Sequence, residues 1–283
     1  MSFSASVANN RNHPHPPPKR VITARKQVGE RIGNKYEIKE VINLRDSTVS
    51  IYAAIDIRTR EEVALKISYK VRKIYQEARF YKYSVGDLDG FPRVKWLWKA
   101  DRDAFGAIAI ERLGPSLDTV IEQTKGRKCS LRTTLLVMDQ VISRIQALHD
   151  RRVVHCGIKP DNFCIGPPGS RNKGKVYLID FDAGKTYISK FGNHRLDSAD
   201  GAANVCWRSL AVEEGLESSR RDDMESAGYL AICLLKGTLL WLFDSANAEW
   251  KKRDIPLERL CKGLPEEFMI YLAYCRSLDF TAA

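Results

Sequence analysis

The spacing of apolar residues changes at Gly114-Pro115, and this change limits the folds that the chain can adopt. Before it, short alternating runs with β-branched residues are typical of strands, and only one segment has helical spacing. After it, apolar residues recur at steps of three or four over long segments, which is typical of amphipathic helices. The sequence therefore predicts an α+β chain with a β-rich first part and a helical second part.

The first part is expected to hold one helix among its strands. The predicted strands cover 36–42, 49–57, 62–68, 94–98 and 107–111, with a turn at 56–60. The helix is predicted at 70–83, where Val71, Ile74, Ala78 and Tyr81 form one apolar stripe and Glu77 lies near its middle.

The second part begins with the clearest helix of the sequence, at 131–149, and this helix leads directly to His155. A β-hairpin is predicted from 162–165 and 175–179, around the turn residues Pro167-Pro168-Gly169. A long segment with little regular pattern follows at 186–218. Further helices are predicted near 223–235 and 265–277.

The composition is that of a globular chain preceded by a polar tail. With 283 residues, 44% of them hydrophobic, the chain can bury a large core and divide into two lobes. Residues 1–30 are rich in Ser, Asn, His and Pro and are predicted to be a disordered basic tail. No apolar run approaches the roughly 20 residues that span a bilayer, and no signal peptide is recognisable, so an intracellular protein that is neither secreted nor membrane-bound is expected.

Cysteine and charge give weaker indications. The seven cysteines are scattered without a C-x-x-C pair, which favours reduced thiols over a zinc site. The net charge of +11 favours contact with nucleic acid, acidic protein surfaces or phosphate groups. Each local basic group, such as Lys251-Lys252-Arg253, is by itself expected to be a solvated surface.

Several motifs occur in the order and spacing of a protein kinase. Val63-Ala64-Leu65-Lys66, with Glu77 eleven residues later, matches the strand lysine and helix glutamate that pair in kinases. Residues 153–162, Val-Val-His-Cys-Gly-Ile-Lys-Pro-Asp-Asn, resemble the catalytic loop H-R-D-L-K-P-E-N, and Asp180-Phe181-Asp182 lies where kinases have D-F-G. The order of the set makes this resemblance specific.

Over residues 36–283 the chain thus resembles the protein kinase fold, and within it the vaccinia-related kinase family. Val154-His155-Cys156-Gly157-Ile158-Lys159 is similar to that family's V-H-G-D-I-K, and Arg220-Arg221-Asp222-Asp223-Met224-Glu225 to its R-R-G-D-L-E. The departures are similar to those of a degenerate poxviral branch. The resemblance implies a two-lobed kinase-like domain at 31–283, with a β-rich N-lobe carrying one main helix at about 31–113 and a helical C-lobe at about 114–283. It also implies an ancestral Ser/Thr kinase activity and an association with host nuclei and with the small DNA-bridging protein that these kinases phosphorylate.

The departures remove groups that phosphotransfer needs. Gly157 occupies the position of the catalytic Asp, so nothing there can orient the substrate hydroxyl or accept its proton, a contribution of about 10²- to 10⁴-fold. The loop over the nucleotide, residues 43–50, has no glycine, although bare backbone is needed close to the phosphates, and Asp46 adds like-charge repulsion. Catalysis is therefore expected to be absent.

Other residues of the site are retained. Lys66 and Glu77 are predicted to be a vestigial nucleotide-site pair, and Asn162 and Asp180 vestigial Mg²⁺ ligands that are not used. Asp182, in place of the usual glycine, puts a second carboxylate beside Asp180, which either binds a cation more strongly or raises the pKa of one of the two. Weak or absent ATP and Mg²⁺ binding is expected, and thus no cofactor.

The residues that support a kinase scaffold are also present. By the resemblance, His155 and Phe181 pack into the apolar column that joins the lobes, Ala64 packs beside the adenine position, and Asp223 caps the catalytic loop. The scaffold is kept while the phosphate-handling groups are lost, as expected if a surface of the protein does the work.

The sequence thus predicts a pseudokinase that binds partners of an active relative, namely that kinase, its substrate or a host protein of the same pathway, in the nucleus and cytoplasm of the host cell. A weakly active kinase that uses Asp161 or Asp182 as its base is one alternative. A binding module that contacts nucleic acid electrostatically through the basic tail is another.

Overall fold

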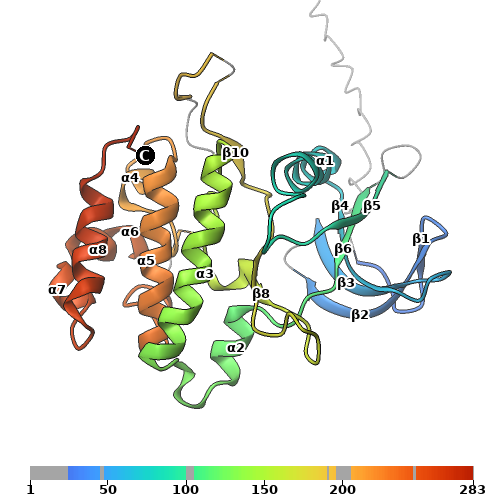
Figure 1. Cartoon of the computed structure of the whole chain (residues 1–283), viewed down its shortest axis with the longest axis horizontal. Coiled ribbons are helices and arrows are strands. Elements are labelled where there is room, and N and C mark those ends of the chain that lie inside the picture. Colours follow the sequence, from blue (N-terminus) through green and yellow to red (C-terminus); the bar gives the residue numbers. More distant parts are fainter. Residues whose placement is uncertain are drawn as a thin grey trace, which may run out of the picture.

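The computed structural model describes residues 25–44, 48–99, 105–189, 191–195, 205–244 and 247–282. An antiparallel sheet forms the N-terminal part, and most helices lie in the C-terminal part (Figure 1). The chain is therefore α+β, as the change of periodicity at Gly114-Pro115 predicts. Most of the predicted tail, residues 1–24, lies outside the described residues, as do Arg45 and Asp46 of the predicted nucleotide loop.

The sheet has the strand order β1-β2-β3-β4-β6-β5, and all its neighbouring strands are antiparallel. Its strands are β1 (Arg31–Ile32), β2 (Tyr36–Leu44), β3 (Val49–Asp56), β4 (Glu62–Ser68), β5 (Val94–Lys99) and β6 (Gly106–Glu111). Side chains alternate between its two faces, and one face buries Ile38, Tyr52 and Leu65 in a core beside Trp96. Because Trp96 and Trp98 share this face, Leu97 between them lies on the opposite face.

Helix α1 (Val71–Arg79) packs against β4, β5 and β6. The predicted helix at 70–83 is thus shorter than expected, because it passes at Phe80 into a π-helical turn, η1 (Phe80–Ser84). This turn carries Tyr81, which is buried against the ring of Phe181. Insertions of this kind in a helix re-aim its last side chains.

The C-terminal part is built on α3 (Leu131–Asp150) and α5 (Arg220–Lys236), which lie side by side, with α8 (Glu266–Ser277) packed on α5 (Figure 1). Ser130 caps α3 by accepting a hydrogen bond from the backbone of Thr133, and Ser219 with Asp222 forms a capping box on α5. The remaining helices are α2 (Leu117–Gln123), η3 (Lys125–Arg127), η4 (Pro160–Asn162), α4 (Leu210–Glu213), α6 (Ala248–Asp254) and α7 (Leu257–Leu260).

Short strands surround the segment that follows α3. They are β7 (Val153–Val154), which pairs with β10 (Lys185–Thr186), and the predicted hairpin, which forms as β8 (Phe163–Ile165) and β9 (Val176–Leu178). The main core runs continuously from Ile74 of α1 through Phe181 to Leu230 of α5. Buried apolar contacts therefore join the sheet and the helical part, and the motif residues Glu77 and Asp180 lie beside these contacts.

Candidate functional site

One buried lysine contacts three carboxylates between the sheet and the helical part. Nζ of Lys66, from β4, lies 2.7 Å from Glu77 on α1 and 2.8 Å from both Asp180 and Asp182, which follow β9. Lys66 and Glu77 are buried, and the side chain of Asp182 is 35% exposed. The sequence predicts the pair of Lys66 with Glu77, but not the direct contact of Asp182 with the same lysine.

This cluster has an excess of negative charge. Burial raises the pKa of Glu77 to about 8, an effect that Lys66 opposes and that the nearby carboxylates Asp180 and Asp182 strengthen. Burial alone would lower the pKa of Lys66, but the attraction of Asp180, Glu77 and Asp182 outweighs it, and the pKa is raised. Lys66 is thus held in its charged form by residues of the protein itself.

The same arrangement decides what a divalent cation would meet beside Lys66. Oxygens of Glu77, Asp180 and Asp182 lie within 4.8 Å of one another, as the ligands of a metal would. However, the ammonium of Lys66 is within hydrogen-bonding distance of all three. One positive charge is thus shared among three acidic groups, and Mg²⁺, which requires a nearly regular octahedron of oxygens, would have to displace Lys66 from them.

The predicted metal ligands Asn162 and Asp180 line a common cavity of about 400 Å³ together with Gly157 and Asp182. Nδ2 of Asn162 donates a hydrogen bond to the carbonyl oxygen of Gly157 at 2.8 Å, so the atom of this side chain that could bind a cation is Oδ1. The structure therefore brings the sequence-predicted residues 66, 77, 157, 162 and 180 into one region.

Asp223 of α5 holds the segment that carries Gly157. Its carboxylate accepts hydrogen bonds from the backbone nitrogens of His155 at 2.8 Å and Cys156 at 2.9 Å, and lies 2.9 Å from Nε2 of His149. These bonds lower the pKa of Asp223 although its burial acts to raise it. Cys156 has a φ of 58°, an unusual conformation that these bonds help to hold. The cap expected of Asp223 is confirmed.

A larger side chain at Gly157 would fit tightly but would need no unusual backbone conformation. The φ angle of Gly157 is not positive, so other residues can adopt its backbone conformation. An added Cβ would lie 3.3 Å from Nδ1 of His155 and 3.4 Å from Nδ2 of Asn162, which requires these neighbours to move by a few tenths of an ångström. The absence of a carboxylate at this position therefore has no backbone cause.

His155 presents a bare nitrogen toward this position. Its Nε2 lies 3.1 Å from the carbonyl oxygen of Ile179, which can only accept, so Nε2 carries the hydrogen. Nδ1 is then an acceptor, and it is buried without a hydrogen-bond partner in the described part of the chain. Burial lowers the pKa of His155, so the ring is neutral and provides no charge in place of the missing carboxylate.

Phe181 is the centre of an aromatic cluster between the sheet and the helical part. Its ring lies 4.9 Å from that of Tyr81, 5.1 Å from that of His155 and 6.2 Å from that of Phe91. The hydroxyl of Tyr81 accepts a hydrogen bond from the backbone nitrogen of Asp180, at 2.8 Å. The contact between His155 and Phe181 is thus as predicted. Because Phe181 lies between Asp180 and Asp182 in the chain, these ring contacts hold the backbone that carries both carboxylates.

A second cavity, of about 620 Å³, lies next to the charged cluster at Lys66. Apolar residues of the sheet, including Ala64 and Ile110, line one side, and Leu113 and Ile179 line the other. Asp161 lines this cavity and not the one at Gly157. An apolar ligand of moderate size has space here, whereas an anionic group that extends toward Lys66 would meet the carboxylates of Asp180 and Asp182.

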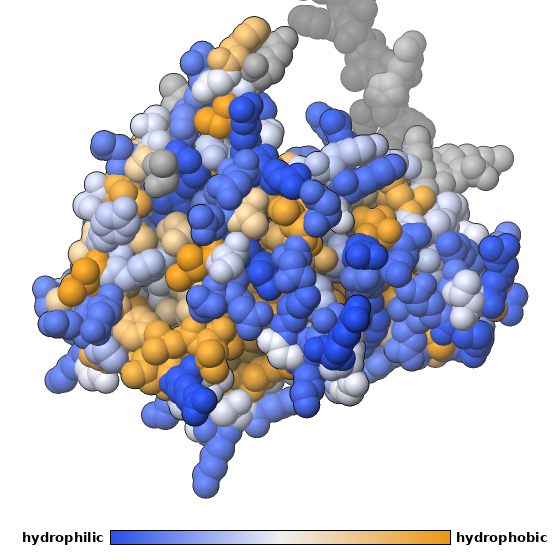
Figure 2. Space-filling view, viewed as in Figure 1, coloured by the Kyte–Doolittle hydropathy of each residue, from blue (hydrophilic) through white to orange (hydrophobic). Residues whose placement is uncertain are grey.

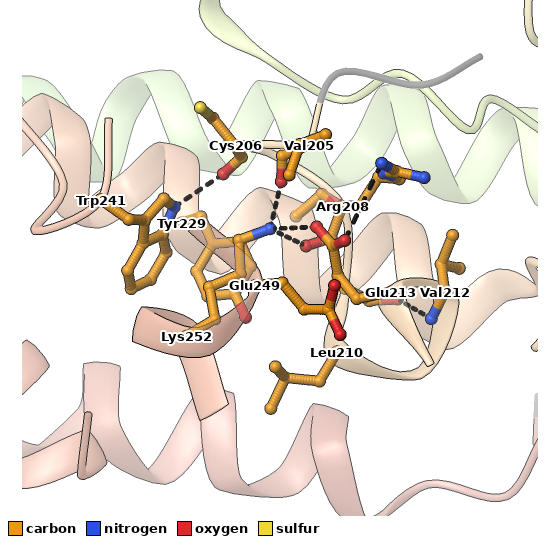
Figure 3. Close-up of polar contacts among 12 residues, drawn as sticks. Val205, Cys206, Arg208, Leu210, Val212, Glu213, Tyr229, Trp241, Glu249 and Lys252 are labelled. Carbon is orange, nitrogen blue, oxygen red and sulfur yellow. Dashed lines mark hydrogen bonds and ion pairs between the residues drawn. The ribbon is translucent and has the colours of Figure 1, made fainter. Parts of the chain in front are cut away.

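Arg208 lines the Gly157 cavity, and Lys252 of α6 forms hydrogen bonds with the segment that carries it (Figure 3). Lys252 is 0% exposed, and its Nζ donates to the carbonyl oxygens of Val205 and Arg208 and lies 2.9 Å from Glu213. The prediction that Lys251-Lys252-Arg253 is wholly a solvated surface is therefore wrong for Lys252. The available signal was the spacing of four from Ala248, which puts both residues on one buried face of α6.

No family model matches the chain. Among the described residues, no helix combines the length and the apolar character that crossing a bilayer requires.

Proposed function

We propose that this chain is a pseudokinase, an inactive Ser/Thr protein kinase homologue of the vaccinia-related kinase family, and that it acts by binding the partners of an active relative. Its two parts are the N-lobe and C-lobe of a kinase-like domain, with the cavity at Gly157 in the place of the catalytic centre. The partners we propose are the active kinase, its substrate or a host protein of the same pathway, in the nucleus and cytoplasm of the host cell.

The observation that carries the proposal is that three acidic side chains of the protein already contact the ammonium of Lys66. In an active kinase this lysine binds nucleotide phosphates and is positioned by one glutamate. Here Asp180 and Asp182 also contact it at 2.8 Å, and these two carboxylates would repel a triphosphate. Gly157 supplies neither a base nor an acceptor for the substrate hydroxyl. Among the described residues, the site thus lacks a free lysine to hold the nucleotide and a carboxylate to activate the alcohol.

The arrangement disfavours the alternative in which another acid serves as the base. Asp161 lies 3.5 Å from Lys159 and lines the neighbouring cavity, away from Gly157. Asp182 does line the Gly157 cavity, but its carboxylate is engaged by Lys66. Neither is free beside the position of the missing side chain.

A phosphotransfer assay with Mg²⁺ or Mn²⁺ tests the proposal. We expect the wild type and Gly157→Asp to transfer no phosphate above a protein-free blank, because restoring one carboxylate leaves Lys66 in contact with three acidic side chains. Millimolar ATP should leave the melting temperature unchanged, since a ligand stabilises only the state that binds it. Transfer by the wild type that Lys66→Ala abolishes would refute the proposal, and loss of that transfer in Asp161→Asn or Asp182→Asn would identify the base.

A further inference from the structure

The side of the sheet next to α1 carries a large basic groove that the site above does not use. It lies between the end of α1, the turn η1 and strand β5, and has a volume of about 1310 Å³. Pockets for small molecules are usually about 300–1,000 Å³, so this groove is suited to an extended ligand.

The charge of the groove is strongly one-sided. Five cationic residues line it, Arg79, Lys82, Arg93, Lys95 and Arg151, against a single acid, Asp87. Two of the five already have acidic partners, because Arg151 lies 2.7 Å from Asp87 and Lys95 lies 2.6 Å from Glu61.

The other three cations are available to a ligand. Arg79, Lys82 and Arg93 are exposed, and within the described ranges their side chains form no ion pair. Lys82 lies 5.3 Å from the centre of the Tyr83 ring, and that ring is 69% exposed. Uncompensated cations beside an exposed aromatic ring are typical of surfaces that bind a partner rather than of a merely solvated face.

Aliphatic and aromatic side chains line the groove, but of the aromatic ones Tyr81 is buried and Trp96 packs in the core on the other face of the sheet. Ala78 and Val94 line the groove, and Leu97 is 38% exposed on the face of β5 opposite Trp96. A single strand of nucleic acid binds through cations and spaced aromatic platforms on which its bases stack. Here Leu97 and Val94 offer aliphatic contact, and of the rings that line the groove Tyr83 is strongly exposed while Tyr75 is only partly so. These side chains suit aliphatic anchors of a peptide better than stacked bases.

We propose that this groove is a docking site for an acidic segment of a partner protein, whose carboxylates pair with Arg79, Lys82 and Arg93 and whose apolar side chains pack on Leu97. The inference rests on the proposed function, since it names the kind of partner that a binding pseudokinase would recruit. The groove is separate from the cluster at Lys66, so the partner need not enter the cavity at Gly157.

The test is direct binding of a fluorescein-labelled peptide of Glu-Glu-Leu repeats to the full chain. We expect this peptide to bind more tightly than Glu-Glu-Ser repeats, Lys-Lys-Leu repeats or oligodeoxythymidine of equal charge. The double variant Arg79→Glu, Lys82→Glu should weaken binding about tenfold or more, since it replaces two positive charges of the groove with two negative ones that repel the acidic peptide. The same change of charge in Lys125→Glu, Lys128→Glu, two exposed residues distant in sequence, should have a smaller effect.

Leu97→Ser distinguishes the two kinds of partner. It should weaken the Glu-Glu-Leu peptide and leave Glu-Glu-Ser unchanged, with unaltered thermal unfolding as evidence of an intact fold. The inference is overturned if the groove variant and the control variant bind alike, or if oligodeoxythymidine binds as tightly as the peptide and Leu97→Ser changes neither. Phosphotransfer by the wild type would refute the proposed function and leave this result standing, so the two failures are separable.

Discussion

At the scale of single residues, Asp182 changes the charge of the site through a contact with Lys66 that the sequence does not predict. Its position beside Asp180 indicates a pair of like charges, but its contact with Lys66 depends on the path of the chain after β9. With Asp182 present, a single ammonium faces three carboxylates, and the pKa of Glu77 rises to about 8, chiefly because that group is buried.

Asp182→Asn should change how stability depends on pH. A carboxyl whose pKa is raised in the folded state, from 4.5 to about 8 for Glu77, stabilises the fold fully below pH 4.5 and loses this contribution as the pH rises toward 8. Removing the charge of Asp182 lowers the pKa of Glu77, so the variant should lose less stability between pH 5 and pH 8. Urea unfolding at intervals of pH measures the slope.

Asp139→Asn, on the exposed surface of α3, is the matched control and should show the wild-type slope. His155 gives a slope of opposite sign, because its lowered pKa makes stability fall as the pH drops below about 6.5. Asp182 is not among the causes of that shift, so the His155 slope should be common to both proteins. Equal slopes in Asp182→Asn and the wild type would contradict the assigned origin of the raised pKa.

At the scale of elements, helix α6 holds the segment from Val205 to Glu213 through one buried lysine. Burial lowers the pKa of Lys252, and Glu213 opposes this shift. Lys252→Met should destabilise the fold by about 3–5 kcal/mol, because Glu213 keeps only Arg208, at 3.8 Å, as a counter-charge and the buried carbonyl oxygens of Val205 and Arg208 lose their donor. Thermal or urea unfolding checks this expectation.

The neighbouring Lys251 is the control for Lys252. Its side chain is 39% exposed and pairs with Asp244, so Lys251→Met should change stability by about 0–1 kcal/mol. If the two variants are equally stable, the bonds drawn in Figure 3 do not hold the segment. Adding Glu213→Leu to Lys252→Met should recover part of the loss, since it removes a buried acid that has lost its nearer cation.

The elements that the sequence predicts well are those whose periodicity reflects direct packing. The strand at 62–68 is found as predicted, and the helix at 131–149 ends one residue later. The helix at 70–83 fails at Phe80, because an apolar stripe does not distinguish an α-helical turn from a π-helical one. Among the site residues, the pairing of Lys66 with Glu77 follows from their spacing along the chain.

The parts that could not be predicted depend on long-range burial of charge. Lys252 looks like any member of a basic triplet until the backbone oxygens of Val205 and Arg208 surround it. Composition gives the total charge, but not that Arg79, Lys82 and Arg93 gather in one groove, because the topology that joins α1 to β5 decides this.

At the scale of the whole molecule, the helical part presents an apolar surface that is separate from both the cluster and the basic groove. Figure 2 shows apolar side chains gathered over the lower part of α3 and α5. They line a groove of about 550 Å³ formed by α3, α5 and α8, in which Leu135 is 53% exposed, and Leu136 beside it is 62% exposed. Apolar surface of this extent gives water few hydrogen-bonding partners and attracts hydrophobic dyes.

The double variant Leu135→Gln, Leu136→Gln should therefore bind less of the dye ANS than the wild type. Because both side chains are already more than half exposed, each substitution should change the free energy of unfolding by only about 0.5 kcal/mol or less. Tyr83→Gln, which removes a ring that is 69% exposed on the N-terminal part, should leave most of the dye signal in place. ANS titration at constant protein concentration measures the difference. If the wild type binds no dye, or if Tyr83→Gln removes the signal instead, the groove between α3, α5 and α8 is not the accessible apolar surface of the molecule.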